Sequence, residues 1–379
     1  MKKLLMIVNE DRFFLSHRKE IALAAQKDGW DVTIVCKDTG QRHEVEALGG
    51  DMIDLPINPT GRNFIQELKT FGFLFRLYRK NKDAVVHHVG LKNILWGGLV
   101  AKLVGVCGVV NAVSGLGTLF NGDQPSKVAR TVMRVMGFSN SRKNVVTIFQ
   151  NHEDEGLFYR YRVVKPGQST FIKGSGVDLN DFAYTPDPVM ADDVMHIIFT
   201  ARMVREKGVM VLIKAAEKLR KAYETKIDFW LCGRLSATPK SLTEEELRSH
   251  CDGRYIKWLE FRSDVKELLQ KASIVAFPSW YREGVPKSLI EACASGRPIV
   301  TCNSIGCKDV VDDGVNGFLI PVRDSDALAD KLRILIEDKA LRIKMGKAAR
   351  EKAEREFSLD KVVQKHLEIY QSLINDEAD

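Results

Sequence analysis

Short apolar segments typical of β-strands alternate with amphipathic segments typical of helices along almost the whole chain. Near the N-terminus, KLLMIV (3–8) is followed by an apolar-periodic stretch from about Arg18 to Lys27, and then by DVTIVC (31–36). Alternation of this kind indicates parallel sheets, because each crossover helix returns the chain to the same edge of the sheet. The pattern therefore predicts an α/β protein with helices on both faces of its sheets.

The alternation starts a second time near the middle of the chain. MHIIFTAR (195–202) precedes the helical stretch VMVLIKAAEKLRKAY (209–223), and KIDFWLCG (226–233) follows. The intervening segment 185–193 contains two prolines and no periodicity, which is typical of a linker. A length of 379 residues also suits two domains better than one core. We predict two Rossmann-like, doubly wound domains, residues 1–184 and 194–360, and a C-terminal helical tail, residues 361–379.

Cysteine usage and hydropathy narrow the class of protein. The seven cysteines form no CxxC pair and are odd in number, which favours reduced thiols in a cytoplasmic protein over a disulfide framework. The first residues, MKKLLMIVNEDRFF, run from apolar directly into charge and predict a strand rather than a signal peptide. The longest apolar run, 94–113, contains Lys102 and four glycines, so we interpret it as a helix followed by a strand.

The formal net charge of +7 is concentrated in one stretch. Residues 55–150 contain 13 Lys or Arg against 3 Asp or Glu, and two basic, apolar segments (71–82 and 126–144) contribute to this excess. Such segments form either ordinary solvated helix faces or a surface that meets anionic headgroups or an anionic substrate. Because no nucleic-acid-binding motif accompanies them, we expect no nucleic-acid partner.

Two glutamates, Glu283 and Glu291, flank a predicted helix start. The stretch follows the strand SIVAF (273–277) and a Pro-Ser pair, and Pro286 suits the first helical position because no N–H is needed there. The N–H groups around 285–288 can bind an anionic group, while each carboxylate can accept from vicinal hydroxyls. The pair therefore suits an extended ligand, although an ordinary helix with a buried or capping glutamate remains the alternative.

A second strand-to-helix loop carries two cations. Arg202 ends the strand FTAR, and Lys207 precedes Gly208 at the start of the next helix. A planar guanidinium and a compact ammonium beside a glycine, which allows close backbone approach, suit a diphosphate. The alternative is a solvated loop.

Taken in order, these motifs resemble the retaining glycosyltransferases of family 4, which have the GT-B fold and an E-x7-E motif. The resemblance also includes Phe277-Pro-Ser and Asp313-Gly-Val-Asn-Gly-Phe-Leu, and it covers nearly the whole chain. It implies a nucleotide-diphosphosugar donor, with UDP favoured, that is bound mainly by the C-terminal domain in a cleft between the two sheets.

Roles for individual residues follow from the resemblance. It implies that Glu283 lies against the donor sugar, that Glu291 accepts from the ribose hydroxyls, and that Arg202 and Lys207 neutralise the diphosphate. The predicted catalytic residues are thus Glu283, Arg202 and Lys207. The backbone near Phe261 and Arg262 would contact the base, where Glu260 replaces the family's usual glycine. The predicted donor-binding residues are Glu291, Gly284, Val285, Pro286, Lys287, Ser288, Phe261 and Arg262.

The N-terminal half resembles the subgroup that extends sugars on polyprenyl-diphosphate carriers in capsule, O-antigen or protein-glycan assembly. The resemblance rests on residues 9–18, 87–105 and 111–120, although Ser114-Gly-Leu-Gly stands where the family often has a histidine. It gives four acceptor-side candidates: His17, Arg18, His88 and Lys92. It also gives the basic stretch a reason, since this domain would meet an anionic membrane and a lipid diphosphate. We therefore expect a cytoplasmic protein attached peripherally to the inner face of the plasma membrane.

The resemblance implies transfer with retention of configuration, in which the leaving diphosphate assists the incoming hydroxyl. Arg202, Lys207 and helix N–H groups would stabilise the diphosphate charge. We expect no metal and no cofactor besides the nucleotide sugar. Asp324-Ser-Asp326 precedes a predicted helix and is interpreted as an N-cap, and Cys302 and Cys307 are interpreted as structural. The expected donor sugar is an N-acetylhexosamine such as GalNAc.

Three alternatives compete with this interpretation. An NDP-sugar 2-epimerase on the same fold would need several acid or base side chains. An oxidoreductase is disfavoured because no GxGxxG follows any predicted strand. A non-catalytic nucleotide-sugar-binding partner protein is disfavoured because Arg202, Lys207, Glu283 and Glu291 are all present.

Overall fold

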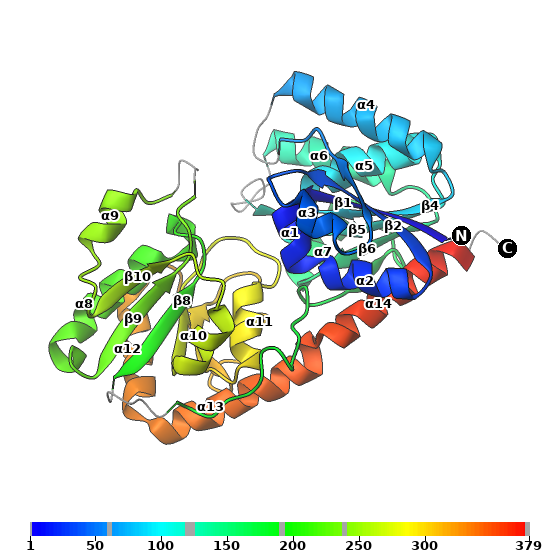
Figure 1. The fold of residues 1–379 in the computed structure, drawn as a ribbon. Coiled ribbons are helices and arrows are strands. Elements are labelled where there is room, and N and C mark those ends of the chain that lie inside the picture. The colour runs from blue at the N-terminus through cyan, green and yellow to red at the C-terminus, as the bar shows by residue number, and fades with distance from the viewer. Residues whose placement is uncertain (1, 59–62, 118–125, 189–193, 237–240, 376–379) are drawn as a thin grey trace. The chain divides into compact units, whose positions relative to one another are not determined.

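The fold consists of two compact units with one parallel sheet each (Figure 1). The structure is a computed structural model that describes residues 2–58, 63–117, 126–188, 194–236 and 241–375. Unit 1 comprises Met1–Ser175 and Asp360–Asp379, and unit 2 comprises Gly176–Leu359. Every pairing between the strands is parallel, and helices cover both faces of each sheet. The predicted α/β class with two doubly wound domains is confirmed.

The sheet of unit 1 has the strand order β3-β2-β1-β4-β5-β6-β7, so the order reverses between β1 and β4. Strand β4 has all six residues buried, as expected of a central strand that is covered on both faces. The elements are β1 Lys2–Glu10, α1 Asp11–His17, α2 Lys19–Lys27, β2 Trp30–Lys37, α3 Arg42–Glu46, β3 Asp51–Asp54, α4 Phe64–Lys80, β4 Ala84–Val89, α5 Leu91–Val104, β5 Gly108–Ala112, α6 Lys127–Ser139, β6 Val145–Phe149, α7 His152–Arg160, β7 Ser169–Phe171 and α14 Leu359–Asn375.

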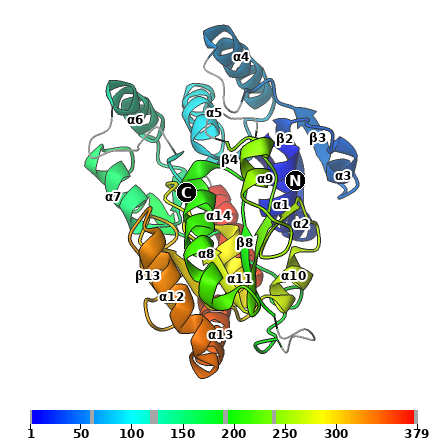
Figure 2. The ribbon, with the colours of Figure 1, turned by 90° about the vertical axis from the view of Figure 1, so that its left-hand side faces the viewer.

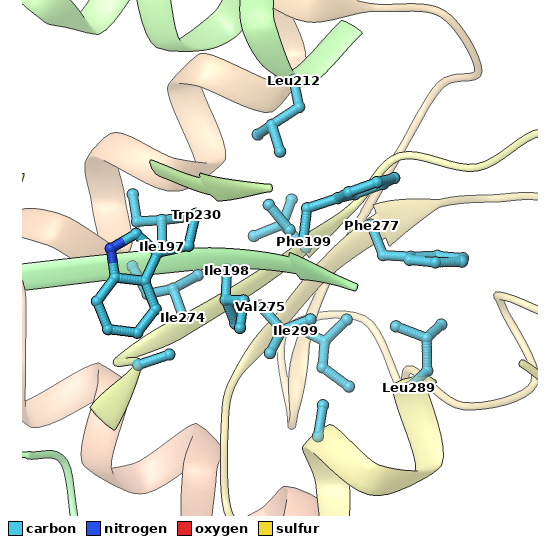
Figure 3. Packing of buried hydrophobic residues seen from close by; sticks show 14 of the residues in the cluster. Ile197, Ile198, Phe199, Leu212, Trp230, Ile274, Val275, Phe277, Leu289 and Ile299 are labelled. Carbon is cyan, nitrogen blue, oxygen red and sulfur yellow. The ribbon is translucent and has the colours of Figure 1, made fainter. Parts of the chain in front are cut away.

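The sheet of unit 2 has the order β10-β9-β8-β11-β12-β13 and reverses between β8 and β11. Figure 3 shows part of its core, in which Phe199 and Phe277 of these two strands stack 5.8 Å apart. The elements are β8 Met195–Thr200, the 3-10 turn η2 Arg205–Lys207, α8 Val209–Tyr223, β9 Ile227–Cys232, α9 Glu244–Ser249, β10 Ile256–Glu260, α10 Val265–Lys271, β11 Ile274–Phe277, α11 Lys287–Ala294, β12 Ile299–Cys302, β13 Gly317–Ile320, α12 Ser325–Glu337, α13 Lys339–Lys352 and the π-helical turn η3 Ala353–Phe357.

The boundary between the units lies at Ser175, nine residues before the predicted end of the first domain at 184. The chain up to Asp187 is held on unit 2 by buried cations. The buried Arg297 donates to the carbonyl oxygen of Thr185 at 2.7 Å, and Arg342 pairs with Asp187 at 2.9 Å. The prolines of the predicted linker 185–193 interrupt the helix and strand periodicity of the sequence, but the chain stays attached to unit 2 as far as Asp187. Residues 189–193 of that segment lie outside the described residues.

The predicted C-terminal helical tail, 361–379, is helical as far as Asn375, but it is not separate from the first unit. Helix α14 belongs to unit 1, where Val362, His366, Tyr370 and Leu373 are buried. The Tyr370 hydroxyl lies 2.6 Å from Nδ1 of His87 on the central strand β4. The spacing of three or four residues between the buried positions gives the helix one face directed toward the sheet.

The apolar run 94–113 covers most of α5 and then β5, as predicted. Within the described ranges, no helix is both long and apolar enough to cross a bilayer. The Asp324 carboxylate accepts hydrogen bonds from the backbone N–H groups of Asp326 and Ala327 at the start of α12, which confirms the predicted N-cap.

Candidate active site

Two loops of unit 2 meet because their strands are neighbours at the point where the strand order reverses. One loop follows β8 and contains Arg202 and Lys207, and the other follows β11 and contains Glu283. In open parallel sheets, ligands bind at the carboxyl ends of the strands beside such a reversal. The sheet order therefore brings together two of the predicted site residues, Lys207 and Glu283, which lie 76 positions apart in the chain.

The ammonium group of Lys207 lies 2.6 Å from the Oε2 atom of Glu283. The two side chains are 12% and 14% exposed, so the pair is mostly buried yet reachable from solvent. The Ser279 hydroxyl donates to the other oxygen of Glu283 at 3.1 Å. The ring centroids of Phe277 and Tyr281 lie 5.3 and 5.7 Å from the ammonium, within the range of cation–π attraction. Both charged groups are thus held in one place before any ligand binds.

The backbones of the two loops are tied together. The carbonyl oxygen of Glu206 accepts from the N–H groups of Trp280 at 2.9 Å and Tyr281 at 3.2 Å. Gly208 has φ of +86°, and a Cβ atom there would lie 2.0 Å from the carbonyl oxygen of Pro278. Only glycine fits here, because any side chain would displace the loop that carries Pro278.

A third loop, after β12, supports the one that carries Glu283. The Ser304 hydroxyl donates to the carbonyl oxygen of Ser279 at 2.8 Å. Gly306 has φ of +86°, and a Cβ atom there would lie 1.7 Å from the carbonyl oxygen of Gly284. A larger residue at 306 would therefore displace the start of the E-x7-E stretch.

Glu291 lies on α11. The N-cap residue of this helix is Pro286, so the helix begins at Lys287, one residue later than predicted. Burial raises the pKa of Glu291 to about 7. The ammonium of Lys287, 3.8 Å from the Glu291 carboxylate, lowers this pKa, whereas the negative charge of Asp181 raises it. The start of α11 is the positive end of the helix dipole. Gly284, Val285 and Pro286 are buried, while Lys287 and Ser288 are partly exposed.

Arg202 is exposed and follows β8 by two residues. Among the described residues, no carboxylate lies within ion-pair distance of its guanidinium. Unlike Lys207, Arg202 therefore has no ion-pair partner among the described residues. Its guanidinium is thus available to bind an anionic ligand.

The predicted base-contact region follows β10. Phe261 is 56% exposed, and the guanidinium of Arg234 lies 3.8 Å from the centroid of its ring. The guanidinium of Arg262 is bound by the carboxylate of Asp264. Glu260 has φ of +57°, a left-handed conformation that glycine adopts without cost.

Two acceptor-side predictions in unit 1 are wrong, because the side chains are in the core. His88 is fully buried, with Nε2 2.8 Å from the Tyr78 hydroxyl and Nδ1 2.9 Å from Oδ1 of Asn111. Burial lowers the pKa of His88 to about 4. Arg18 is only 3% exposed, and burial lowers its pKa to about 10. Neither side chain can reach a substrate at the surface.

The other two acceptor-side candidates keep access to solvent. His17 ends α1, where its ring stacks on Phe13 at 4.2 Å and Nδ1 lies 2.7 Å from the Ser16 hydroxyl. Lys92, at the start of α5, pairs with Glu67 at 2.6 Å and is 21% exposed. Their role as acceptor-side residues stays a prediction.

Sequence reasoning missed several side chains that shape the site. Ser279 was used only as the end of a strand, although a hydroxyl four positions before Glu283 is within reach of its carboxylate. Arg234 comes two residues after the end of β9, as Arg202 comes two residues after the end of β8. This equivalent position could have identified Arg234 as a site residue. Asp181, which pairs with Lys266 at 2.8 Å, had no recognisable signal because it lies in irregular chain before β8.

Comparison with known proteins agrees with this geometry. The family model described as glycosyl transferases group 1 matches residues 187–352, and the model described as glycosyl transferase 4-like matches residues 3–151. One curated relative is the N,N'-diacetylbacillosaminyl-diphospho-undecaprenol alpha-1,3-N-acetylgalactosaminyltransferase of Campylobacter jejuni. It is 26% identical over 93% of this chain and 93% of its own length.

A second relative is the UDP-Gal:alpha-D-GlcNAc-diphosphoundecaprenol alpha-1,3-galactosyltransferase of Escherichia coli, 23% identical over 91% of this chain and 90% of its own. Among solved structures, Anabaena Alr3699/HepE in complex with UDP has the same fold, with a TM-score of 0.76 and 18% identity over 98% of this chain and 100% of that one.

The two sheets, the paired loops and the two family matches define a glycosyltransferase of the GT-B fold. Its C-terminal half matches the group 1 glycosyltransferases, and its N-terminal half matches the glycosyl transferase 4-like family. The predicted fold, family and enzyme class are confirmed.

Proposed function

We propose that the protein transfers a sugar from a UDP-sugar to a saccharide carried on a polyprenyl diphosphate, with retention of configuration. The observation that carries the proposal is the pairing of Lys207 with Glu283 at 2.6 Å beside the start of α11. A nucleotide sugar joins an anionic diphosphate directly to a ring of hydroxyls. A cation and a carboxylate held side by side match that junction.

Each group then has a role along the donor. Lys207, Arg202 and the first N–H groups of α11 bind the diphosphate, and Glu283 accepts from the hydroxyls of the transferred sugar. Glu291 accepts from the ribose, and Phe261 lies at the base. When the bond between the anomeric carbon and the diphosphate oxygen breaks, negative charge grows on that oxygen, and the cations stabilise it. The oxygen then takes the proton of the attacking hydroxyl, which approaches on the same face.

The donor and acceptor assignments are supported by the relatives. Their names specify UDP-linked galactose in one case, and undecaprenyl-diphosphate-linked acceptors in both. The name of the Campylobacter enzyme specifies transfer of N-acetylgalactosamine, which supports an N-acetylhexosamine as the donor sugar here. A capsular polysaccharide glycosyltransferase of Staphylococcus aureus is also similar over 45% of this chain, in line with a role in surface polysaccharide assembly. We propose that no metal takes part, because Arg202 and Lys207 can neutralise the charge that develops on the diphosphate.

We further propose that unit 1 attaches to the inner face of the plasma membrane. Helices α4, α5 and α6 pack next to one another on one face of its sheet (Figure 2). The first turn of α4 presents Phe64, Ile65 and Leu68, which are 73%, 65% and 54% exposed. Exposed basic residues follow on the same helices: Lys69, Arg76, Arg79 and Lys80 on α4, and Lys127, Arg130 and Arg134 on α6. Apolar side chains beside basic ones suit an anionic lipid surface.

A donor screen tests the proposed function. Purified protein is incubated with each UDP- and GDP-sugar and with undecaprenyl-diphosphate-linked N-acetylglucosamine or N,N'-diacetylbacillosamine, in EDTA, and the released nucleotide is quantified. We expect release with one UDP-sugar, lowered at least about 100-fold in Glu283→Gln and in Arg202→Met. The matched control Lys218→Met alters an exposed cation on α8 and should keep full activity. Activity that requires a divalent metal would contradict the metal-free mechanism.

A further inference from the structure

A cavity of about 330 Å³ lies in unit 1, where β2 and β3 end and α4 begins. Its volume falls at the lower end of the range for small-molecule sites, and it lies at the carboxyl edge of a parallel sheet, where ligands bind. None of its lining residues is among the predicted donor or acceptor residues. They are Lys37, Asp38, Asp54, Leu55, Pro56, Ile57, Asn58, Asn63 and Gln66.

The strand side of the cavity contributes one cation and one carboxylate that are not paired. Oδ1 of Asp54 accepts from the N–H group of Asp38 at 2.9 Å. No protein group of the described chain hydrogen-bonds to Oδ2 of Asp54, and no described carboxylate lies within ion-pair distance of Lys37. The carboxylate of Asp38 is already committed, because it accepts from Gly40 at 2.8 Å and from Arg42 at 3.1 Å.

The helix side of the cavity contributes two carboxamides. Oδ1 of Asn63 caps α4 by accepting from the N–H group of Ile65 at 3.0 Å, which leaves the Asn63 amide as a donor. Nε2 of Gln66 donates to the carbonyl oxygen of Pro56 at 2.8 Å, which leaves its oxygen as an acceptor. These bonds fix the two side chains, so their remaining groups are presented in set directions.

The charge and polarity of the walls select the ligand. Arg42 pairs with both Asp38 and Glu46, and the described lining residues include Lys37 against Asp38 and Asp54, so the cavity has no net positive charge for a phosphate or a nucleotide. Its remaining groups include donors on Lys37 and Asn63 and acceptors on Asp54 and Gln66, and Leu55, Pro56 and Ile57 add an apolar wall. A neutral ring with several hydroxyls, each of them a donor and an acceptor, satisfies this set. That description fits a sugar.

We propose that this cavity is a subsite for a sugar ring of the lipid-linked acceptor. The inference rests on the proposed function and specifies where its acceptor saccharide binds. The turn of α4 that lines the cavity through Asn63 and Gln66 also presents the exposed Phe64, Ile65 and Leu68. A saccharide joined to a lipid can therefore place its sugar in the cavity while its apolar chain follows the outside of the same turn.

Asp54→Asn and Lys37→Met test the subsite by steady-state kinetics. Asn at 54 keeps an oxygen for the Asp38 N–H group, so the fold should be retained, and a thermal melt verifies this. The matched control is Asp51→Asn, the same charge change at the opposite end of the four-residue strand β3. We expect the acceptor KM to rise about tenfold or more in the two cavity variants, with kcat and donor KM unchanged. Asp51→Asn should match the wild type.

Saturation-transfer NMR gives a second readout that needs no activity. The probe is the methyl α-glycoside of N-acetylglucosamine, and we expect transfer to its ring protons that is lost in the Asp54→Asn, Lys37→Met double variant. Unchanged acceptor KM in both cavity variants, or transfer that survives the double variant, overturns the subsite. If the wild type releases nucleotide from no donor, the proposed function fails, while the NMR result still decides whether the cavity binds sugar.

Discussion

Replacement of Lys207 by Met removes the ammonium group and keeps a side chain of similar length. Breaking a fully buried ion pair costs about 3–5 kcal/mol, because the remaining charge stays desolvated. Here Glu283 is 14% exposed and keeps the hydrogen bond from Ser279, so we expect a loss of about 2 kcal/mol in the free energy of unfolding. For a unit of this size, that corresponds to a fall in Tm of about 4–8 °C.

The assay is a double-mutant cycle of Lys207→Met and Glu283→Gln, read by chemical unfolding and thermal melts. Because the two side chains touch, the double variant should lose at least about 1 kcal/mol less than the sum of the single variants. The control Lys218→Met, whose partner Asp326 is 81% exposed, should cost less than about 0.5 kcal/mol. A coupling below roughly 0.3 kcal/mol, or a Lys207→Met protein as stable as Lys218→Met, would refute the reasoning.

Three further predictions concern other parts of the chain. Because the pKa of Glu291 is raised to about 7, the folded protein binds more protons than the unfolded chain between about pH 4.5 and 7, and wild-type stability falls as the pH rises. Melts of Glu291→Gln from pH 5 to 8 should show a gain over wild type that grows by up to roughly 3 kcal/mol; a constant difference would contradict the shift. Gly306→Ala should abolish nucleotide release and cost at least about 3 kcal/mol, whereas Gly314→Ala, also at positive φ but facing open space, should cost only about 1 kcal/mol. His88→Ala should lower stability by about 2–4 kcal/mol and Tyr78→Phe by about 1 kcal/mol, with turnover per folded molecule unchanged in both; loss of turnover without loss of stability would restore His88 to the site.

Local sequence signals predicted the loops of the site but not their contact. Strand, loop and helix follow one another within about 15 residues, so Lys207 and Glu283 could each be placed at the end of a strand. Their pairing depends on β8 and β11 being neighbours, with β9 and β10 on the other side. That arrangement is a long-range property of the sheet, which no local pattern contains.

The errors in unit 1 have a related cause. The resemblance made His88 an acceptor-side candidate, yet a central parallel strand is buried on both faces and its polar residues must find partners inside. His88 finds Tyr78 and Asn111, which are separated from it by 10 and 23 positions. Helix α14 was misplaced for the same reason, since its periodic apolar face does not say which unit it covers.

The measurement that tests the central claim most directly is mass spectrometry of the lipid-linked acceptor. Undecaprenyl-diphosphate-linked N-acetylglucosamine or N,N'-diacetylbacillosamine is incubated with the protein, EDTA and the UDP-sugar that supports nucleotide release. The account predicts an acceptor heavier by one sugar residue, and NMR of that product should show the donor's anomeric configuration. Nucleotide release that leaves the acceptor mass unchanged, or a product of inverted configuration, would contradict it.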